Sequence, residues 1–189
     1  MSEVLPLIPD AIDGFGALVD RVPADRWDTP TPCSDWSVRD LVNHLTSEHL
    51  WAPHLLRGET IAQVGDRYDG DVLGGDPAGT WHRAAAESAV AWRGAKAGER
   101  VHVSFGLISL VEYAEQMYLD LLVHSWDLAR GARLEYPMDP AGADHALAYV
   151  TPHVGEWGGA FADPVETDSD SPADRLIAIT GRDPAWTAR

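Results

Sequence analysis

Two histidines and one aspartate have the residue types and spacing of a metal site. Asp120 and His124 are four residues apart, so on a helix their side chains project from the same face. His44 lies between Leu41 and Leu45 and is expected to face the same core. Two imidazoles and a carboxylate from two packed helices suit a divalent cation and leave a position open for water or substrate. Zn²⁺ is the first candidate ion, with Ni²⁺ or another divalent ion as the alternative.

The cost of burial supports this hypothesis. A carboxylate and two imidazoles turned toward an apolar core are costly unless they are paired or bound to a metal. A simpler alternative stays open, because Asp120 and His124 could form only a local pair one helical turn apart. An inward histidine such as His44 also commonly hydrogen-bonds to a carbonyl or carboxylate. The Asp-x-x-x-His spacing does not decide between these hypotheses, since it is common on helices.

Two acidic residues near the predicted ligands have candidate roles. Glu48 follows His44 by one turn and is a competing ligand or a general base, or else an exposed acid at the edge of the helix. Asp127 follows His124 by three residues and could orient that histidine from behind, or pair locally.

Other residues with reactive or aromatic side chains are assigned simpler roles. Cys33 is interpreted as a small buried residue, because none of its sequence neighbours offers a base or a cation that would lower its pKa. Trp51 and Trp126 are candidates for lining a pocket near the metal. The remaining histidines are interpreted as surface or loop residues: His49, His54, His82, His102, His145 and His153.

Helices are needed to position these residues, and apolar residues three and four apart predict them. Ser37 with Asp40, and Ser109 with Glu112, have the spacing of capping boxes at helix starts, and Gly131 is expected to end the helix that carries His124. Residues 58–75 are predicted to be a loop, and 101–105 an extended segment without a partner. The predicted helices cover residues 9–22, 37–57, 76–92, 109–131, 139–153 and 171–180.

This pattern predicts an all-α fold. We expect a single domain over residues 1–189, built as a four-helix bundle with additional short C-terminal helices.

Composition excludes several classes of function. With 14 basic and 30 acidic residues the formal net charge is −16, which argues against binding to nucleic acid or to an anionic membrane. One cysteine rules out an internal disulfide, and no segment has the apolar length of a membrane span. The N-terminal segment lacks a signal-peptide pattern, so a cytoplasmic location is expected. We find no nucleophile elbow, phosphate-binding loop, dinucleotide fingerprint or His-Glu-x-x-His motif.

Three segments resemble a known family: TPCSDWSVRDLVNHL, LDLLVHSWDLARG and DRLIAITGRDPAW. They are similar to actinobacterial proteins related to the N-terminal domain of mycothiol-dependent maleylpyruvate isomerase, in the DinB-like superfamily of metal-binding four-helix bundles. The resemblance runs from about residue 8 to about residue 186. It implies a zinc-type site made by His44, Asp120 and His124, where some members carry glutamate in place of Asp120. The isomerase has a further C-terminal domain that we do not expect here, so isomerisation of maleylpyruvate is not expected.

Three functions follow from the residues and the resemblance together. The first is a metal-dependent transferase or isomerase in which a small thiol, mycothiol by resemblance, attacks a small electrophile, with Glu48 as the candidate proton carrier. The second is a non-catalytic, metal-stabilised bundle that binds a small ligand or a partner. The third is a metal-dependent hydrolase, in which the same site activates water. Assembly as a homodimer is left open.

Overall fold

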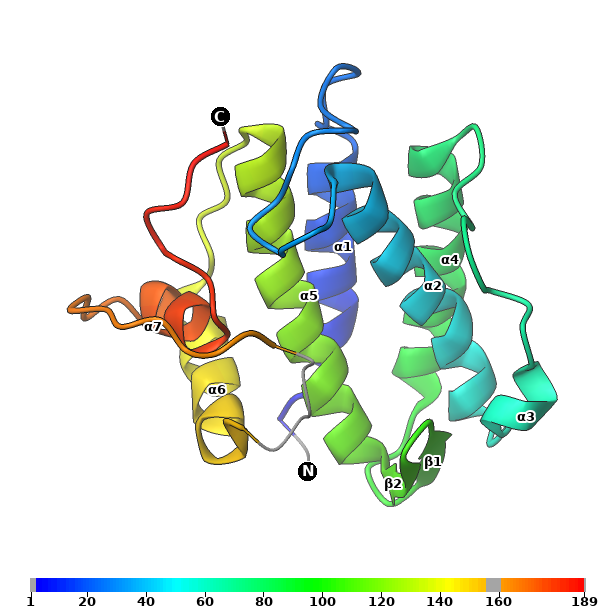
Figure 1. Cartoon of the computed structure of the whole chain (residues 1–189). Helices are drawn as coiled ribbons and strands as arrows, with labels where there is room; N and C mark the ends of the chain where they lie inside the picture. The colour runs from blue at the N-terminus through cyan, green and yellow to red at the C-terminus, as the bar shows by residue number, and fades with distance from the viewer. Residues whose placement is uncertain (1–2, 156–160, 189) are drawn as a thin grey trace.

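Four long helices form the body of the protein (Figure 1). The computed structural model describes residues 3–155 and 161–188. Helices α1 and α2 each pack against both α4 and α5, which makes a closed bundle. The predicted all-helical bundle is therefore confirmed. The four helices are α1 (Leu7–Val19), α2 (Val38–Leu56), α4 (Pro77–Gly94) and α5 (Leu110–Ala132).

Apolar side chains from all four helices fill the centre of the bundle. Phe15 of α1 packs edge-on against Trp81 of α4, with their ring centroids 4.6 Å apart, and both side chains are fully buried. Leu45 of α2 and Leu121 of α5 are buried in the same core. The two helices that carry the predicted metal ligands are thus fixed by ordinary apolar packing.

The helix starts follow the chemistry of their caps. At α2 the Ser37 hydroxyl accepts a hydrogen bond from the backbone of Asp40, and the Asp40 carboxylate accepts one from the backbone of Ser37. This is the predicted capping box. At α4 the Asp76 carboxylate caps the helix, and Pro77 occupies the first turn, where its missing N–H costs nothing.

The capping box predicted at the start of α5 forms only in half. The Ser109 hydroxyl accepts a hydrogen bond from the backbone N–H of Glu112. The Glu112 carboxylate turns instead to two other donors, the Gln116 amide at 3.1 Å and the Tyr149 hydroxyl at 2.6 Å. A tertiary contact has therefore replaced the local one.

Gly131 does not end α5, contrary to the prediction. The helix continues past it, and Arg133 takes the left-handed conformation with φ of 56°. Gly131 instead allows the loop between α1 and α2 to come close. A Cβ atom there would lie 2.9 Å from the side chains of Thr31 and Val38 and 3.1 Å from the carbonyl oxygen of Pro30.

A β-hairpin connects α4 to α5, so the prediction of an unpartnered segment at 101–105 was wrong. Strand β1 (Arg100–Val103) pairs antiparallel with β2 (Gly106–Ser109), which follows after two residues. Gly106 has φ of 138°, which suits a tight turn that few other residues could make. The predicted loop at 58–75 also contains one short helix, α3 (Ile61–Val64).

The predicted additional C-terminal helices are present, and they lie against one side of the bundle. Helix α6 (Pro140–Val150) packs on α5, and α7 (Pro172–Ile179) packs on α6 (Figure 1). A short 3-10 helix, Thr151–His153, extends α6 to the predicted end of that segment. The described C-terminal tail after α7 then runs beside the end of α5, where Arg133 donates a hydrogen bond to the backbone of Ala188.

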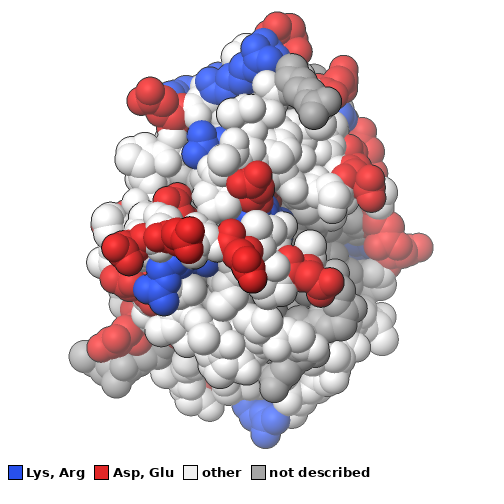
Figure 2. Space-filling model, turned by 60° about the vertical axis from the view of Figure 1, so that its left-hand side comes forward, with Lys and Arg blue, Asp and Glu red and all other residues white. Residues whose placement is uncertain are grey.

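The surface agrees with the acidic composition. Figure 2 shows the face that carries α6 and α7, where acidic side chains are spread widely and basic side chains occur in small groups. In the part of the chain that the structure describes, no helix combines the length and apolar character that crossing a membrane requires.

The close approach at Gly131 gives a stability prediction. The methyl group added by Gly131→Ala would lie too close to two side chains and a carbonyl oxygen. We therefore expect the substitution to lower the free energy of unfolding by about 1–3 kcal/mol. Gly14→Ala in α1 is the matched control, because no atom lies within 4 Å of the added Cβ. It should raise the free energy of unfolding by up to about 1 kcal/mol, as expected for alanine in an open helix position. Urea unfolding followed by circular dichroism measures both, and equal effects would contradict the assigned role of Gly131.

Candidate metal centre

The three predicted ligands meet where α2 packs against α5. Nε2 of His44 lies 3.2 Å from Oδ2 of Asp120, and Nε2 of His124 lies 3.3 Å from Oδ1 of the same carboxylate. One ligand atom from each residue lies within 4.8 Å of the other two. The helical spacing therefore brings all three donor groups to one point.

The three side chains differ in their exposure to solvent. His44 and Asp120 are 30% and 24% exposed, whereas His124 is only 5% exposed. The cluster thus has a buried back formed by His124 and an open front formed by the other two. The expectation that His44 faces the core is corrected, because it lies at the edge of the α2–α5 contact. An ion held here would keep its free coordination positions on the solvent side.

The charges in this cluster depend strongly on one another. Burial alone would raise the pKa of Asp120, but the two imidazoles outweigh it and hold the pKa well below its ordinary value. Burial alone would lower the pKa of His124, but the charge of Asp120 and hydrogen bonds to Asp120 and Asp127 raise it to about 9. A positive charge is therefore favoured between these carboxylates.

Asp127 contacts His124 within the same helix, an arrangement that fits both of its predicted roles, the local pair and the group that orients the histidine. Its side chain is fully buried, and its Oδ2 lies 3.0 Å from Nδ1 of His124. In the neutral imidazole, a carboxylate acceptor at this distance favours the tautomer with the proton on Nδ1, and the Nε2 lone pair is then directed toward Asp120.

The loop between α1 and α2 supplies two residues whose place at the site was not foreseen. The Trp36 ring lies 4.7 Å from the His44 ring and 5.6 Å from the His124 ring, and so covers both imidazoles. Cys33 lies near His124 and Asp127, although its sequence neighbours had suggested no such contact. Burial raises the pKa of the Cys33 thiol to about 11, which favours its neutral form.

The tryptophans expected to line the pocket lie elsewhere. Trp51 packs against Tyr68, and Trp126 lines a separate hollow beside Arg130. Trp36 takes the role that had been assigned to them.

Glu48 lies close to the cluster but does not join it. In the described residues, the group whose ligand atoms converge contains His44, Asp120 and His124 without Glu48. Burial raises the pKa of Glu48, opposed by the nearby His44 and His124 and assisted by Asp120. It is therefore not the exposed acid of the simpler hypothesis, and its environment suits proton transfer.

One of the histidines assigned to the surface is a core residue. His49 is fully buried, its Nδ1 lies 2.8 Å from the Ser88 hydroxyl, and burial lowers its pKa to about 4. Its position four residues after Leu45 continues the apolar face of α2, and this spacing could have revealed it. Its ring packs edge-on against Trp81 and so forms part of the core.

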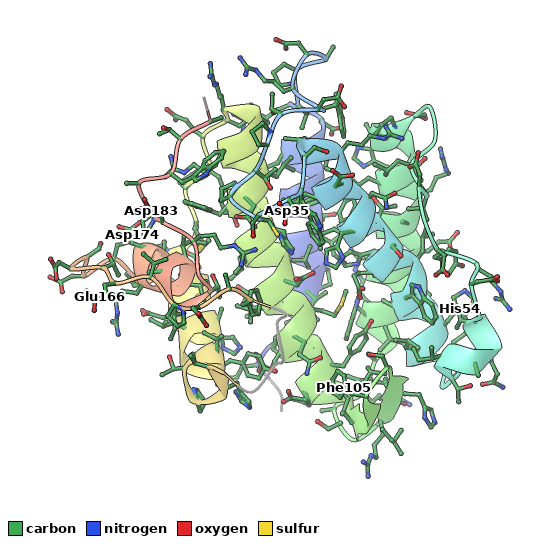
Figure 3. The ribbon with its side chains drawn as sticks, in the orientation of Figure 1. Asp35, His54, Phe105, Glu166, Asp174 and Asp183 are labelled. Atoms are coloured by element: carbon green, nitrogen blue, oxygen red, sulfur yellow. The ribbon has the colours of Figure 1, made fainter. Side chains whose placement is uncertain are left out.

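An open pocket of about 730 Å³ adjoins the front of the cluster. Trp36 and His44 line it together with Asp35, which Figure 3 labels between α2 and α5. Its other wall is the loop before α4, which the Asn43 side chain holds: its amide donates to the carbonyl oxygen of Gly70, and its Oδ1 accepts from the backbone N–H of Val72. The pocket gives a small polar molecule direct access to His44.

Comparisons with known proteins agree with this architecture. Residues 8–129 match the family described as the Mycothiol maleylpyruvate isomerase N-terminal domain. Two uncharacterized proteins of Mycobacterium tuberculosis, from strains CDC 1551 and H37Rv, are each 33% identical over 186 residues, covering 91% of this chain and 93% of theirs.

A solved structure has a similar fold. It is the crystal structure of a mutant of mycothiol-dependent maleylpyruvate isomerase, with a TM-score of 0.66 and 17% sequence identity, and the match covers 86% of this chain and 72% of that one. The bundle, the position of the matched segment and the sequence relatives lead to one conclusion: the chain belongs to the Mycothiol maleylpyruvate isomerase N-terminal domain family.

Proposed function

We propose that this protein binds one divalent metal ion through His44, Asp120 and His124 and uses it in the chemistry of a small thiol. The observation that carries the proposal is the convergence of these three donor groups within 4.8 Å, beside an open pocket that His44 lines. Zn²⁺ is the proposed ion, because two imidazoles and one carboxylate with an open position are typical of catalytic zinc sites.

The donor set fits a cation on chemical grounds. The neutral tautomer of His124 that donates to Asp127 directs a lone pair at Asp120 across 3.3 Å. Two acceptors at that distance repel each other unless a proton or a cation lies between them. Because Nε2 of His44 also approaches Asp120, a single ion could neutralise the carboxylate and engage both imidazoles.

Family membership supports a small thiol as the co-substrate, and mycothiol is the thiol we propose. A divalent ion stabilises the thiolate form of a sulfur bound to it, which makes the sulfur nucleophilic near neutral pH. The polar pocket beside His44 suits a small hydrophilic thiol better than an apolar ligand. A cytoplasmic location belongs to the proposal, because a thiol co-substrate must remain reduced.

Residues of the chain would then handle the proton and the electrophile. Glu48 would accept the proton when the thiol S–H bond breaks, and the resulting thiolate sulfur would then form the bond to an electrophilic carbon. The raised pKa of Glu48 suits this task, since a base works best when its pKa is near the working pH. In a transferase the Glu48 proton passes to the adduct or the leaving group, whereas in an isomerase the sulfur–carbon bond later breaks again.

The first test is direct metal binding. Wild-type protein reloaded with Zn²⁺ and desalted should retain one ion per chain, and His44→Ala or His124→Ala should weaken affinity by more than about 100-fold, since even orienting residues contribute 10–100-fold. His82→Ala is the control, because His82 is half exposed and paired with Asp20. Elemental analysis with chelator competition measures the affinities. Equal metal content in all four proteins would refute the site.

The pKa of His124 predicts how metal stabilisation depends on pH. In the metal-free protein, folding raises the pKa of His124 from 6.5 to about 9. The charged imidazole therefore stabilises the fold fully at pH values below about 6.5, and this stabilisation is lost as the pH rises through about 9. A metal requires the neutral imidazole. The rise in Tm caused by Zn²⁺ should therefore be smallest near about pH 6 and increase toward about pH 9. Thermal unfolding with Zn²⁺ and with chelator tests this, and an increment independent of pH would contradict it.

Catalysis is tested with the metal-loaded protein, mycothiol and a panel of small electrophiles. We expect consumption of thiol that stops on chelation, and Glu48→Gln should lower kcat by about 10²–10⁴-fold without changing metal content. Glu87→Gln, an exposed acid on α4, is the matched control and should leave kcat unchanged. Turnover without thiol would favour a hydrolase. A metal-loaded protein that binds mycothiol but converts nothing would favour the non-catalytic bundle.

A further inference from the structure

A buried arginine from the C-terminal segment reaches the back of the candidate metal centre. Arg182 follows α7 and is only 6% exposed. Its guanidinium Nη2 donates to Oδ2 of Asp127 at 2.9 Å, and its Nε lies 3.3 Å from the same oxygen. Its Nη1 donates to the carbonyl oxygen of Thr180 at 2.7 Å, which fixes the guanidinium plane.

One oxygen atom links this arginine to a predicted metal ligand. Oδ2 of Asp127 lies 2.9 Å from Arg182 and 3.0 Å from Nδ1 of His124. Asp127 is fully buried, and a buried carboxylate is stable only when its charge is paired and its lone pairs are used. Arg182 meets both requirements and leaves the shared oxygen as an acceptor for His124.

We propose that Arg182 is a positioning residue for the metal ligand His124, acting through Asp127. This rests on the proposed metal centre. The guanidinium holds the carboxylate in one orientation, and the carboxylate holds the imidazole with its Nε2 toward His44 and Asp120. Arg182 and Asp127 would thus set the affinity of the site and the regularity of its coordination, although neither contacts the ion.

The position of Arg182 in the chain gives this proposal its consequence. The family match ends at residue 129, and Arg182 lies beyond it. The family domain supplies the three proposed ligands, whereas the segment after α7 supplies the group that fixes one of them. Docking of α7 and metal binding should therefore stabilise each other.

A purely structural alternative exists, in which Arg182 only anchors the C-terminal segment. It predicts that removing the guanidinium lowers the stability of the metal-free protein and leaves the geometry of the metal site unchanged. The two hypotheses differ in metal affinity, in the coordination spectrum and in the dependence of the Arg182 effect on Asp127.

The experiment compares Arg182→Gln, Arg182→Lys and Asp127→Asn in the full chain. Arg175→Gln is the matched control, because Arg175 is an exposed arginine on α7. Chelator competition gives the Kd for Zn²⁺, and the visible spectrum of the Co²⁺-loaded protein reports the coordination geometry. Circular dichroism and thermal unfolding of the metal-free proteins show that each variant is folded.

We expect Arg182→Gln and Asp127→Asn each to raise the Kd by about 10–100-fold and to change the Co²⁺ spectrum. The Kd of Arg182→Lys should lie between the Kd of these variants and that of the wild type, since lysine keeps the charge without the planar guanidinium group. In the Asp127→Asn background, Arg182→Gln should have little further effect, because it acts through that carboxylate.

Folded Arg182 variants with the wild-type Kd and Co²⁺ spectrum would overturn the positioning role and leave the metal centre standing. Additive effects of the two substitutions would also overturn it, because Arg182 would then act by another route. A wild-type protein that binds no metal would refute the proposed function itself, and this inference with it.

Discussion

The contact between α2 and α5 must accommodate three ionisable side chains within an otherwise apolar bundle, and the surrounding structure depends on how it does so. His124 is almost completely buried between two carboxylates, whereas His44 and Asp120 keep contact with solvent. Removing a charge from water is costly unless a partner replaces the lost hydration. The buried half of the cluster is therefore the half that is surrounded by fixed partners, and the exposed half remains free to accept a ligand.

Elements distant in sequence supply these partners. Gly131 lets the loop before α2 approach α5, and this approach brings Trp36 over both imidazoles and Cys33 beside His124. From the opposite end of the chain, Arg182 reaches the carboxylate behind His124. Substitutions that change the fit of the loop or the tail should thus affect the cluster without touching its three donor groups, because close packing transmits small displacements.

The sequence allowed the helices and the donor triad to be predicted, because both depend on periodicity within single elements. The apolar stripe of α5 includes His124, and one helical turn separates it from Asp120. Trp36 and Arg182 could not be predicted in this way, because loop and tail contacts are set by tertiary packing that no local period encodes. The same reason explains the error at Gly131. A glycine near the end of a predicted helix can either end the helix or allow another segment to approach it closely, and the sequence alone does not distinguish the two. The hairpin was missed for a local reason, since β2 is short and merges with the start of α5.

The division between a rigid back and an open front also constrains the chemistry. A ligand that enters from the pocket meets His44 first, and it would exchange without disturbing the buried contact of His124 with Asp127. In the proposed site, the pocket and the loop before α4 would therefore decide which molecule binds, whereas α7 and the residues after it would hold the metal ligands in place. A chain with the same three donor groups but without an equivalent of Arg182 would keep the ligand set and lose part of its preorganisation. If the proposed metal centre holds, metal affinity and substrate choice would vary independently within such a family, because different segments of the chain would control them.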